Sequence, residues 1–204
     1  MKKWLKWIFV NFSLKKRRKL SNQEFQVLVD NIRYTYWQFC FNRIGHKEIE
    51  GRVYKNEIDG DKNFKLIWDM ILVSFLNSYL LGLAKIFDRK SYGDKNTLSI
   101  FHFIKKSKFN KDDRATIRKV KQARNEIIAH LEATKVMEGK NRLEHFGLDG
   151  QAKDIESLFT NTFNLVNNIE ENFSYKHKID PVKEKAYIQK EFDKWFKIFK
   201  EMYT

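Results

Sequence analysis

The residues best suited to chemistry in this sequence lie in one short stretch, RNEIIAH at positions 124–130. An arginine such as Arg124 can hold a phosphate through paired, charge-assisted hydrogen bonds. A histidine such as His130 can accept and donate a proton near neutral pH. RNA carries its own nucleophile, the 2′-hydroxyl group, so these two side chains could cleave it without a metal ion. Such a short pattern also fits surface residues of an ordinary amphipathic helix.

The spacing within this stretch sets a geometric condition. Residues six positions apart on an α-helix lie about 9 Å apart along its axis and about 120° apart around it. Arg124 and His130 therefore do not share one face of a regular helix. The long arginine side chain could bridge the gap, or a two-fold dimer could bring two copies of the stretch together. Glu126 precedes His130 by one turn, where it could orient the imidazole or simply face solvent.

Composition limits the fold and the partners. The 204 residues include 42% hydrophobic and 15% aromatic residues, which is ample for a packed core, and the single proline favours long helices. The net charge of +14 favours RNA or an anionic membrane as partner, although a lysine-rich background would also produce it. The single cysteine, Cys40, excludes an intramolecular disulfide and predicts a reducing, cytoplasmic setting. No zinc-ligand spacing or phosphate-binding glycine loop is evident, so we expect no metal and no cofactor.

Hydrophobic periodicity and capping residues predict an all-α bundle of four to six helices. The first begins at Ser21, with Glu24 completing a capping box, and ends at Gly45 as a C-cap. The remaining helices are expected over 61–87, from about 97, from about 110 through 131, over 152–173, and from Pro181 with Asp180 as N-cap. No stretch reaches the roughly 18–20 apolar residues that span a bilayer.

The first twenty residues form an appendage to the helical domain expected over 21–204. They contain eight Lys or Arg and no acid, with Trp4, Ile8 and Phe9 on one broad apolar helical face. This helix could dock on the bundle or a second subunit, lie on a membrane surface, or contact RNA. Its basic run is the candidate contact for RNA or another anionic surface: Lys15, Lys16, Arg17, Arg18 and Lys19.

An ordered set of segments resembles one known family. An apolar helix from Ile67 ends in a Leu-Ala-x-x-x-Asp pattern at Asp88, a polar loop leads to NTLSI at 96–100, and a charged helix ends in RNEIIAH. This order resembles the HEPN superfamily, in the branch similar to abortive-infection U-type proteins. The resemblance covers 64–131 well and the flanking helices loosely. It implies a dimerising helical bundle, commonly a metal-independent ribonuclease that acts as a toxin or phage-defence effector, with an antitoxin or another defence protein as a possible partner.

The resemblance also assigns roles. Arg124, Asn125 and His130 match the catalytic motif, while Asp88 and Glu126 are supporting candidates. It implies transesterification in which His130 moves a proton and Arg124 holds the scissile phosphate. Some members carry a tyrosine two residues after the histidine that a partner enzyme modifies. Glu132 stands at that position here, which argues against this control. Other members bind RNA, nucleotides or partners without cutting, which is the alternative function.

Four further histidines have no comparable setting and are expected at the surface or in loops: His46, His102, His145 and His177.

Overall fold

The computed structural model describes residues 21–53, 62–88, 98–130, 152–169 and 178–203. Within these ranges, side chains are described except at 49–53, 62–66, 69, 126–130, 200 and 202–203. Five α-helices lie in this part of the chain: α2 (Asn22–Val53), α3 (Lys62–Ile86), α4 (Lys111–His130), α6 (Ala152–Ile169) and α7 (Pro181–Tyr203). Two short 3₁₀ turns, η1 (Ile100–His102) and η2 (Lys106–Lys108), connect α3 to α4, and the described ranges contain no β-strand. The predicted all-α class is confirmed.

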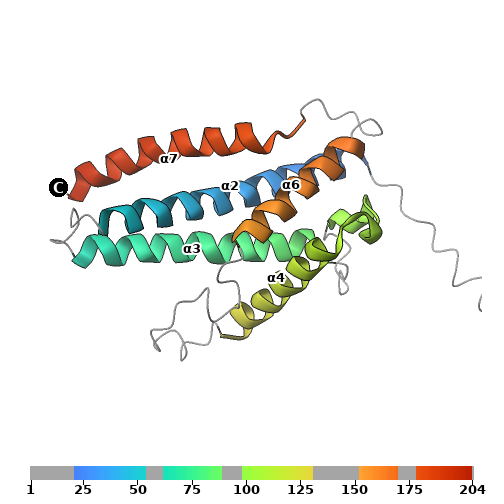
Figure 1. Ribbon diagram of the computed structural model, residues 1–204, viewed down its shortest axis with the longest axis horizontal. Helices are drawn as coiled ribbons and strands as arrows, with labels where there is room; N and C mark the ends of the chain where they lie inside the picture. The colour runs from blue at the N-terminus through green and yellow to red at the C-terminus, as the bar shows by residue number, and fades with distance from the viewer. Residues whose placement is uncertain (1–20, 54–61, 89–97, 131–151, 170–177, 204) are drawn as a thin grey trace, which may run out of the picture.

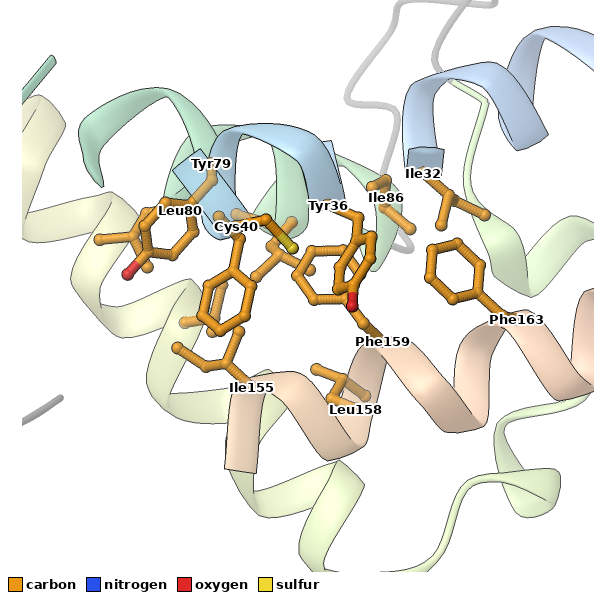
Figure 2. Packing of buried hydrophobic residues seen from close by; sticks show 14 of the residues in the cluster. Ile32, Tyr36, Cys40, Tyr79, Leu80, Ile86, Ile155, Leu158, Phe159 and Phe163 are labelled. Carbon is orange, nitrogen blue, oxygen red and sulfur yellow. The ribbon is translucent and has the colours of Figure 1, made fainter. Parts of the chain in front are cut away.

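The long helices α2 and α3 form an antiparallel pair at the centre of the bundle (Figure 1). Helix α7 packs against α2, α4 packs against α3, and α6 contacts both α4 and α7. Aromatic rings join the layers. In Figure 2, Tyr36 of α2 meets Phe159 and Phe163 of α6, with ring centroids 5.0 and 5.1 Å away. Cys40 lies in the same core with 2% of its surface exposed, as a core thiol should.

Local capping interactions begin two helices, α2 and α7, where the sequence predicts. At Ser21, the backbone N–H donates to Glu24 Oε2 at 2.8 Å and the side chain accepts from the Glu24 N–H at 3.1 Å. Asp180 Oδ1 accepts from the backbone N–H of Val182 at 2.9 Å, directly before the first helical residue of α7. These interactions involve neighbours in the sequence, and this is why a pattern of residue types predicts them.

Gly45 does not end the first helix, which continues to Val53. The glycine instead lies where α2 approaches α3, since a β-carbon at this position would meet Leu72 Cδ2 at 2.5 Å and Trp68 at 3.3 Å. The prediction of a C-cap at Gly45 is therefore wrong, because the missing side chain serves packing and not chain reversal.

One other expected element differs from the structure, and one is described only in part. The short helix expected from about residue 97 consists of the turns η1 and η2. Helix α6 is described over Ala152–Ile169, and the rest of the range predicted for it falls outside the described residues. The appendage at 1–20, with its basic run, also lies outside them. Within the described ranges, no helix is both long and apolar enough to cross a bilayer.

A polar contact fixes α7 on α2. The Glu184 carboxylate accepts a 2.6 Å hydrogen bond from Trp37 Nε1 and lies 3.0 Å from Arg33 Nε. Tyr187 of α7 packs on the Trp37 ring with centroids 5.5 Å apart. Farther along, Trp68 of α3 packs against Phe199 of α7, with ring centroids 5.4 Å apart. Helix α7 thus has a polar attachment near its start and an aromatic one toward its end.

Candidate active site

The carboxylate of Asp88 is positioned by the C-terminal end of α3. The backbone N–H of Asp88 donates to the carbonyl of Lys85 at 3.2 Å, which extends the last turn beyond Ile86. Ser99 is buried and its hydroxyl donates to the Ile86 carbonyl at 3.1 Å. This bond satisfies one of the terminal carbonyls that a helix leaves without an internal partner. Asp88 therefore projects from a helix end that is fixed by hydrogen bonds.

Three phenylalanine rings bring the end of α3 to the start of α4. Phe87, the neighbour of Asp88, lies 6.0 Å from Phe101 and 5.5 Å from Phe109, and the last two rings are 5.8 Å apart. Tilted and edge-on ring pairs at these separations are attractive in addition to the area that they bury. The cluster connects the residue before Asp88 to the segment that leads into α4.

The start of α4 is capped and joined to α6. Asn110 Oδ1 accepts from the Asp113 N–H at 2.8 Å, while Asp113 Oδ2 accepts from the Asn110 N–H at 3.0 Å. The buried Asp113 carboxylate also accepts from Asn161 Nδ2 of α6 at 3.1 Å. An acidic residue in the first turn is stabilised by the helix dipole. The N-terminal end of the helix that carries Arg124 is therefore fixed to the core.

Arg124 meets the carboxylate of Asp88 across the α3–α4 packing. Its Nη1 donates to Asp88 Oδ2 at 2.7 Å, while its Nη2 and Nε donate to Asn125 Oδ1 at 2.9 and 3.2 Å. Both sides of the guanidinium are engaged, so its plane has a defined orientation. About a quarter of each charged side chain remains exposed, 25% for Arg124 and 24% for Asp88. The arrangement presents an oriented cation to an anion arriving from solvent.

Lys121 joins this cluster although sequence reasoning did not select it. Its Nζ lies 3.7 Å from Asp88 Oδ1, so one carboxylate faces two cations. Burial lowers the pKa of Lys121, and the positive charges of Arg124 and Lys106 lower it further, while Asp88 acts in the opposite direction. The available signal was position, because Lys121 precedes Arg124 by three residues and falls near it on a helix.

Helix α4 remains helical through His130, so the expected geometry of the motif applies: about 9 Å along the axis and about 120° around it separate the positions of Arg124 and His130. The side chains of Glu126 and His130 lie outside the described ones. The structure therefore brings together Arg124, Asn125 and Asp88. The roles assigned to Glu126, His130 and the basic run at 15–19 stay predictions.

The other histidines divide between described and undescribed residues. His102 is exposed, and its Nδ1 accepts from the Ser99 N–H at 3.1 Å, which caps η1. His46 is half-buried in α2, while His145 and His177 fall outside the described ranges. Among the described side chains, no three His, Cys, Asp or Glu residues gather in an arrangement that could hold a metal ion.

Comparison with known proteins gives one match. The family model of AbiU2, a HEPN family, matches residues 14–187. No curated protein and no solved structure matches the chain. The matched region includes Asp88, Arg124 and His130, together with all of α2, α3, α4 and α6. Because the match covers most of the sequence, the chain belongs to the AbiU2 family of HEPN proteins.

Proposed function

We propose that this protein is a metal-independent endoribonuclease that acts in the cytoplasm as a toxin or abortive-infection effector against phage. The observation that carries the proposal is the oriented guanidinium of Arg124, held between Asp88 and Asn125 on the helix that also carries His130. Membership in a HEPN family supports this reading of the cluster.

The proposed reaction is an internal transesterification. The 2′-oxygen of a ribose attacks the adjacent phosphorus, its proton is lost, and the bond from phosphorus to the 5′-oxygen breaks. The leaving 5′-oxygen takes up a proton, so the products are a 2′,3′-cyclic phosphate and a 5′-hydroxyl. His130 accepts the first proton or donates the second. Arg124 stabilises the negative charge that develops on the phosphate, and Asn125 keeps the guanidinium in place.

Arg124 retains donors for a phosphate. Its described hydrogen bonds to Asp88 and Asn125 use three of the five guanidinium N–H groups. The other two are available to phosphate oxygens without breaking either contact. Substrate binding therefore does not require the arginine to leave its position.

The proposed active form is a homodimer. The positions of Arg124 and His130 are separated along and around α4. An isologous interface could bring Arg124 of one subunit close to His130 of the other. RNA is the proposed substrate, and an antitoxin or another defence protein is the proposed regulator. The segment 1–20 is proposed to add a contact to the bundle, a sister subunit, RNA or a membrane surface.

A second candidate function is a non-catalytic module that binds RNA, a nucleotide or a partner protein. The engagement of Arg124 by Asp88 favours it, because a paired arginine can serve structure alone. If this second function is correct, the protein can bind RNA but produces no RNA fragments.

The test is incubation of purified protein with total RNA in EDTA. Fragments ending in 2′,3′-cyclic phosphate are expected, and Arg124→Ala and His130→Ala should each abolish them while helicity stays unchanged. Arg118→Ala is the matched control, since Arg118 is exposed on the same helix and its loss changes the charge equally. Full activity in either motif variant would contradict the site, and a strict requirement for a divalent ion would contradict the mechanism.

A further inference from the structure

Two cations of α4 share a single carboxylate at the candidate active site. Arg124 Nη1 lies 2.7 Å from Asp88 Oδ2, within hydrogen-bonding distance, whereas Lys121 Nζ lies 3.7 Å from Oδ1. The shorter distance shows that Asp88 interacts more strongly with Arg124 than with Lys121. Lys121 thus has an ion pair with Asp88 but not the close, charge-assisted hydrogen bond that Arg124 makes.

The ammonium group of Lys121 is partly buried among charges of both signs. Burial is the main cause that lowers the pKa of this ammonium group; the charges of Arg124 and Lys106 lower it further, while the Asp88 carboxylate raises it. An anion placed beside Lys121 would therefore stabilise its charged form. The side chain remains 28% exposed, so such an anion can reach it from solvent.

We propose that Lys121 binds a second backbone phosphate of single-stranded RNA, next to the phosphate held by Arg124. This inference rests on the proposed ribonuclease function and identifies part of its substrate-binding surface. Lys121 and Arg124 are one helical turn apart, and residues at this spacing have β-carbons about 5–6 Å apart. Arg124 keeps its hydrogen bond to Asp88, whereas the longer contact of Lys121 lets its flexible side chain turn toward the neighbouring phosphate of the same strand.

The position of Lys121 also gives the RNA a direction. His130 lies beyond Arg124 toward the C-terminal end of α4, whereas Lys121 lies toward its N-terminal end. The second phosphate is therefore on the side of Arg124 away from the position of His130 in the same subunit. A substrate must extend at least one nucleotide in that direction to gain this contact.

The test measures RNA binding without cleavage. A His130→Ala background prevents turnover, and fluorescence anisotropy of a labelled single-stranded RNA gives Kd between about 50 and 300 mM salt. In that background, Lys121→Gln should weaken binding by about threefold to tenfold. It should also reduce the slope of log affinity against log salt by about 0.7, the value for one lost phosphate contact on a single strand.

Two further variants separate phosphate binding from structural support. Lys119→Gln removes the same charge from an exposed position of α4 and should leave the slope nearly unchanged. Lys121→Arg keeps the charge and should retain most of the affinity. The inference would be overturned if Lys121→Gln and Lys119→Gln gave equal slopes of log affinity against log salt. It would also be overturned if Lys121→Arg lost as much RNA affinity as Lys121→Gln.

The outcomes distinguish this inference from the proposed function. If the wild-type protein does not cut RNA but the Lys121→Gln slope falls, the ribonuclease proposal fails and the phosphate site stands. If the wild-type protein cuts RNA while Lys121→Gln binds as the control does, the inference about Lys121 fails alone. Absence of any RNA binding by the His130→Ala protein overturns the inference, and it overturns the proposed function too if the wild-type protein leaves RNA intact.

Discussion

Arg124 and Asp88 meet across two helices, with Nη1 2.7 Å from Oδ2, although they are 36 positions apart in the sequence. The direction of the guanidinium is thus set by how α3 packs on α4. The ring cluster of Phe87, Phe101 and Phe109 supports that packing next to Asp88 in the sequence. Catalysis by Arg124 should therefore depend on a residue that touches no substrate.

The first prediction concerns Asp88→Asn, which keeps the size of the side chain and removes its charge. Arg124 loses its ion pair and its fixed orientation, so kcat for RNA cleavage should fall by about 10- to 100-fold. The affinity for RNA should stay the same or increase, because the substitution removes a negative charge from the site. Steady-state kinetics and anisotropy measure the two effects. Asp30→Asn on exposed α2 surface is the control, and an unchanged kcat in Asp88→Asn would contradict the positioning role.

The second prediction concerns Gly82→Ala in α3. An added β-carbon would lie 2.6 Å from Thr35 Oγ1 and 2.9 Å from its Cγ2. Thr35 cannot turn away without losing the 2.7 Å bond from its hydroxyl to the Asn31 carbonyl. Alanine gains about 1 kcal/mol of helix propensity, but the overlap costs about 1–3 kcal/mol, so a net destabilisation of up to about 2 kcal/mol is expected. Urea unfolding measures it.

The Thr35→Ala variant tests the cause of that destabilisation. It removes the two atoms nearest to the added β-carbon, so the double variant should recover part of the stability lost in Gly82→Ala. A Gly82→Ala protein as stable as the wild type would show that α2 and α3 can separate at this crossing without penalty.

The third prediction concerns alkaline pH. Burial raises the pKa of the Cys40 thiol to about 11, whereas an unfolded thiol ionises near about 8.5. Between these values the folded protein keeps a proton that the unfolded chain has lost, so the free energy of unfolding falls as pH rises. The contribution of the protonated Cys40 thiol to the free energy of unfolding is therefore fully present below about pH 8.5. Urea unfolding from pH 7 to 10.5 should show a shallower fall for Cys40→Ala.

In the Cys40→Ala protein, the free energy of unfolding should still fall somewhat at alkaline pH, because buried tyrosines contribute to the same effect. Burial also raises the pKa values of Tyr36 and Tyr79, so their ionisation opposes folding in the same direction at higher pH. Identical pH dependence in the wild-type and Cys40→Ala proteins would mean that the thiol does not contribute.

The fourth prediction concerns the basic segment 1–20. Its broad apolar face would leave a large hydrophobic patch uncovered unless it packs on protein. Deleting these residues should therefore lower thermal stability or loosen the proposed dimer, with little effect on membrane partitioning. Melting curves, sedimentation and co-sedimentation with anionic liposomes measure the three effects. If only the full-length protein binds liposomes and the truncated one keeps its stability and assembly, the segment is a membrane anchor.

Local interactions made much of the fold predictable. The caps at Ser21 and Asp180 join residues a few positions apart, so the identity of those residues specifies them. The apolar stripes of α2 and α6 likewise identified core residues such as Tyr36 and Phe159. Gly45 was misread because glycine suits both a helix end and a close helix crossing, and only the position of α3 decides between them.

The candidate site was less accessible to sequence reasoning. The stretch at 124–130 and the resemblance pointed to Arg124 and Asp88, but their contact depends on the packing of two helices. Lys121 was missed because a lysine on a helix rich in lysines looks like a solvated residue. Its burial beside Arg124 follows only from the position of Asp88 at the end of α3.

The capped start of α4 and the contact at Arg124 together fix the length of the helix between them. Asp113 is held by Asn161, and about three turns later Arg124 meets Asp88. One inserted or deleted residue between these points would rotate the rest of the helix by about 100° and shift it by about 1.5 Å. Arg124 would then point away from its partner. Evolution can thus exchange the exposed residues of this segment, but it cannot change their number without losing the ion pair.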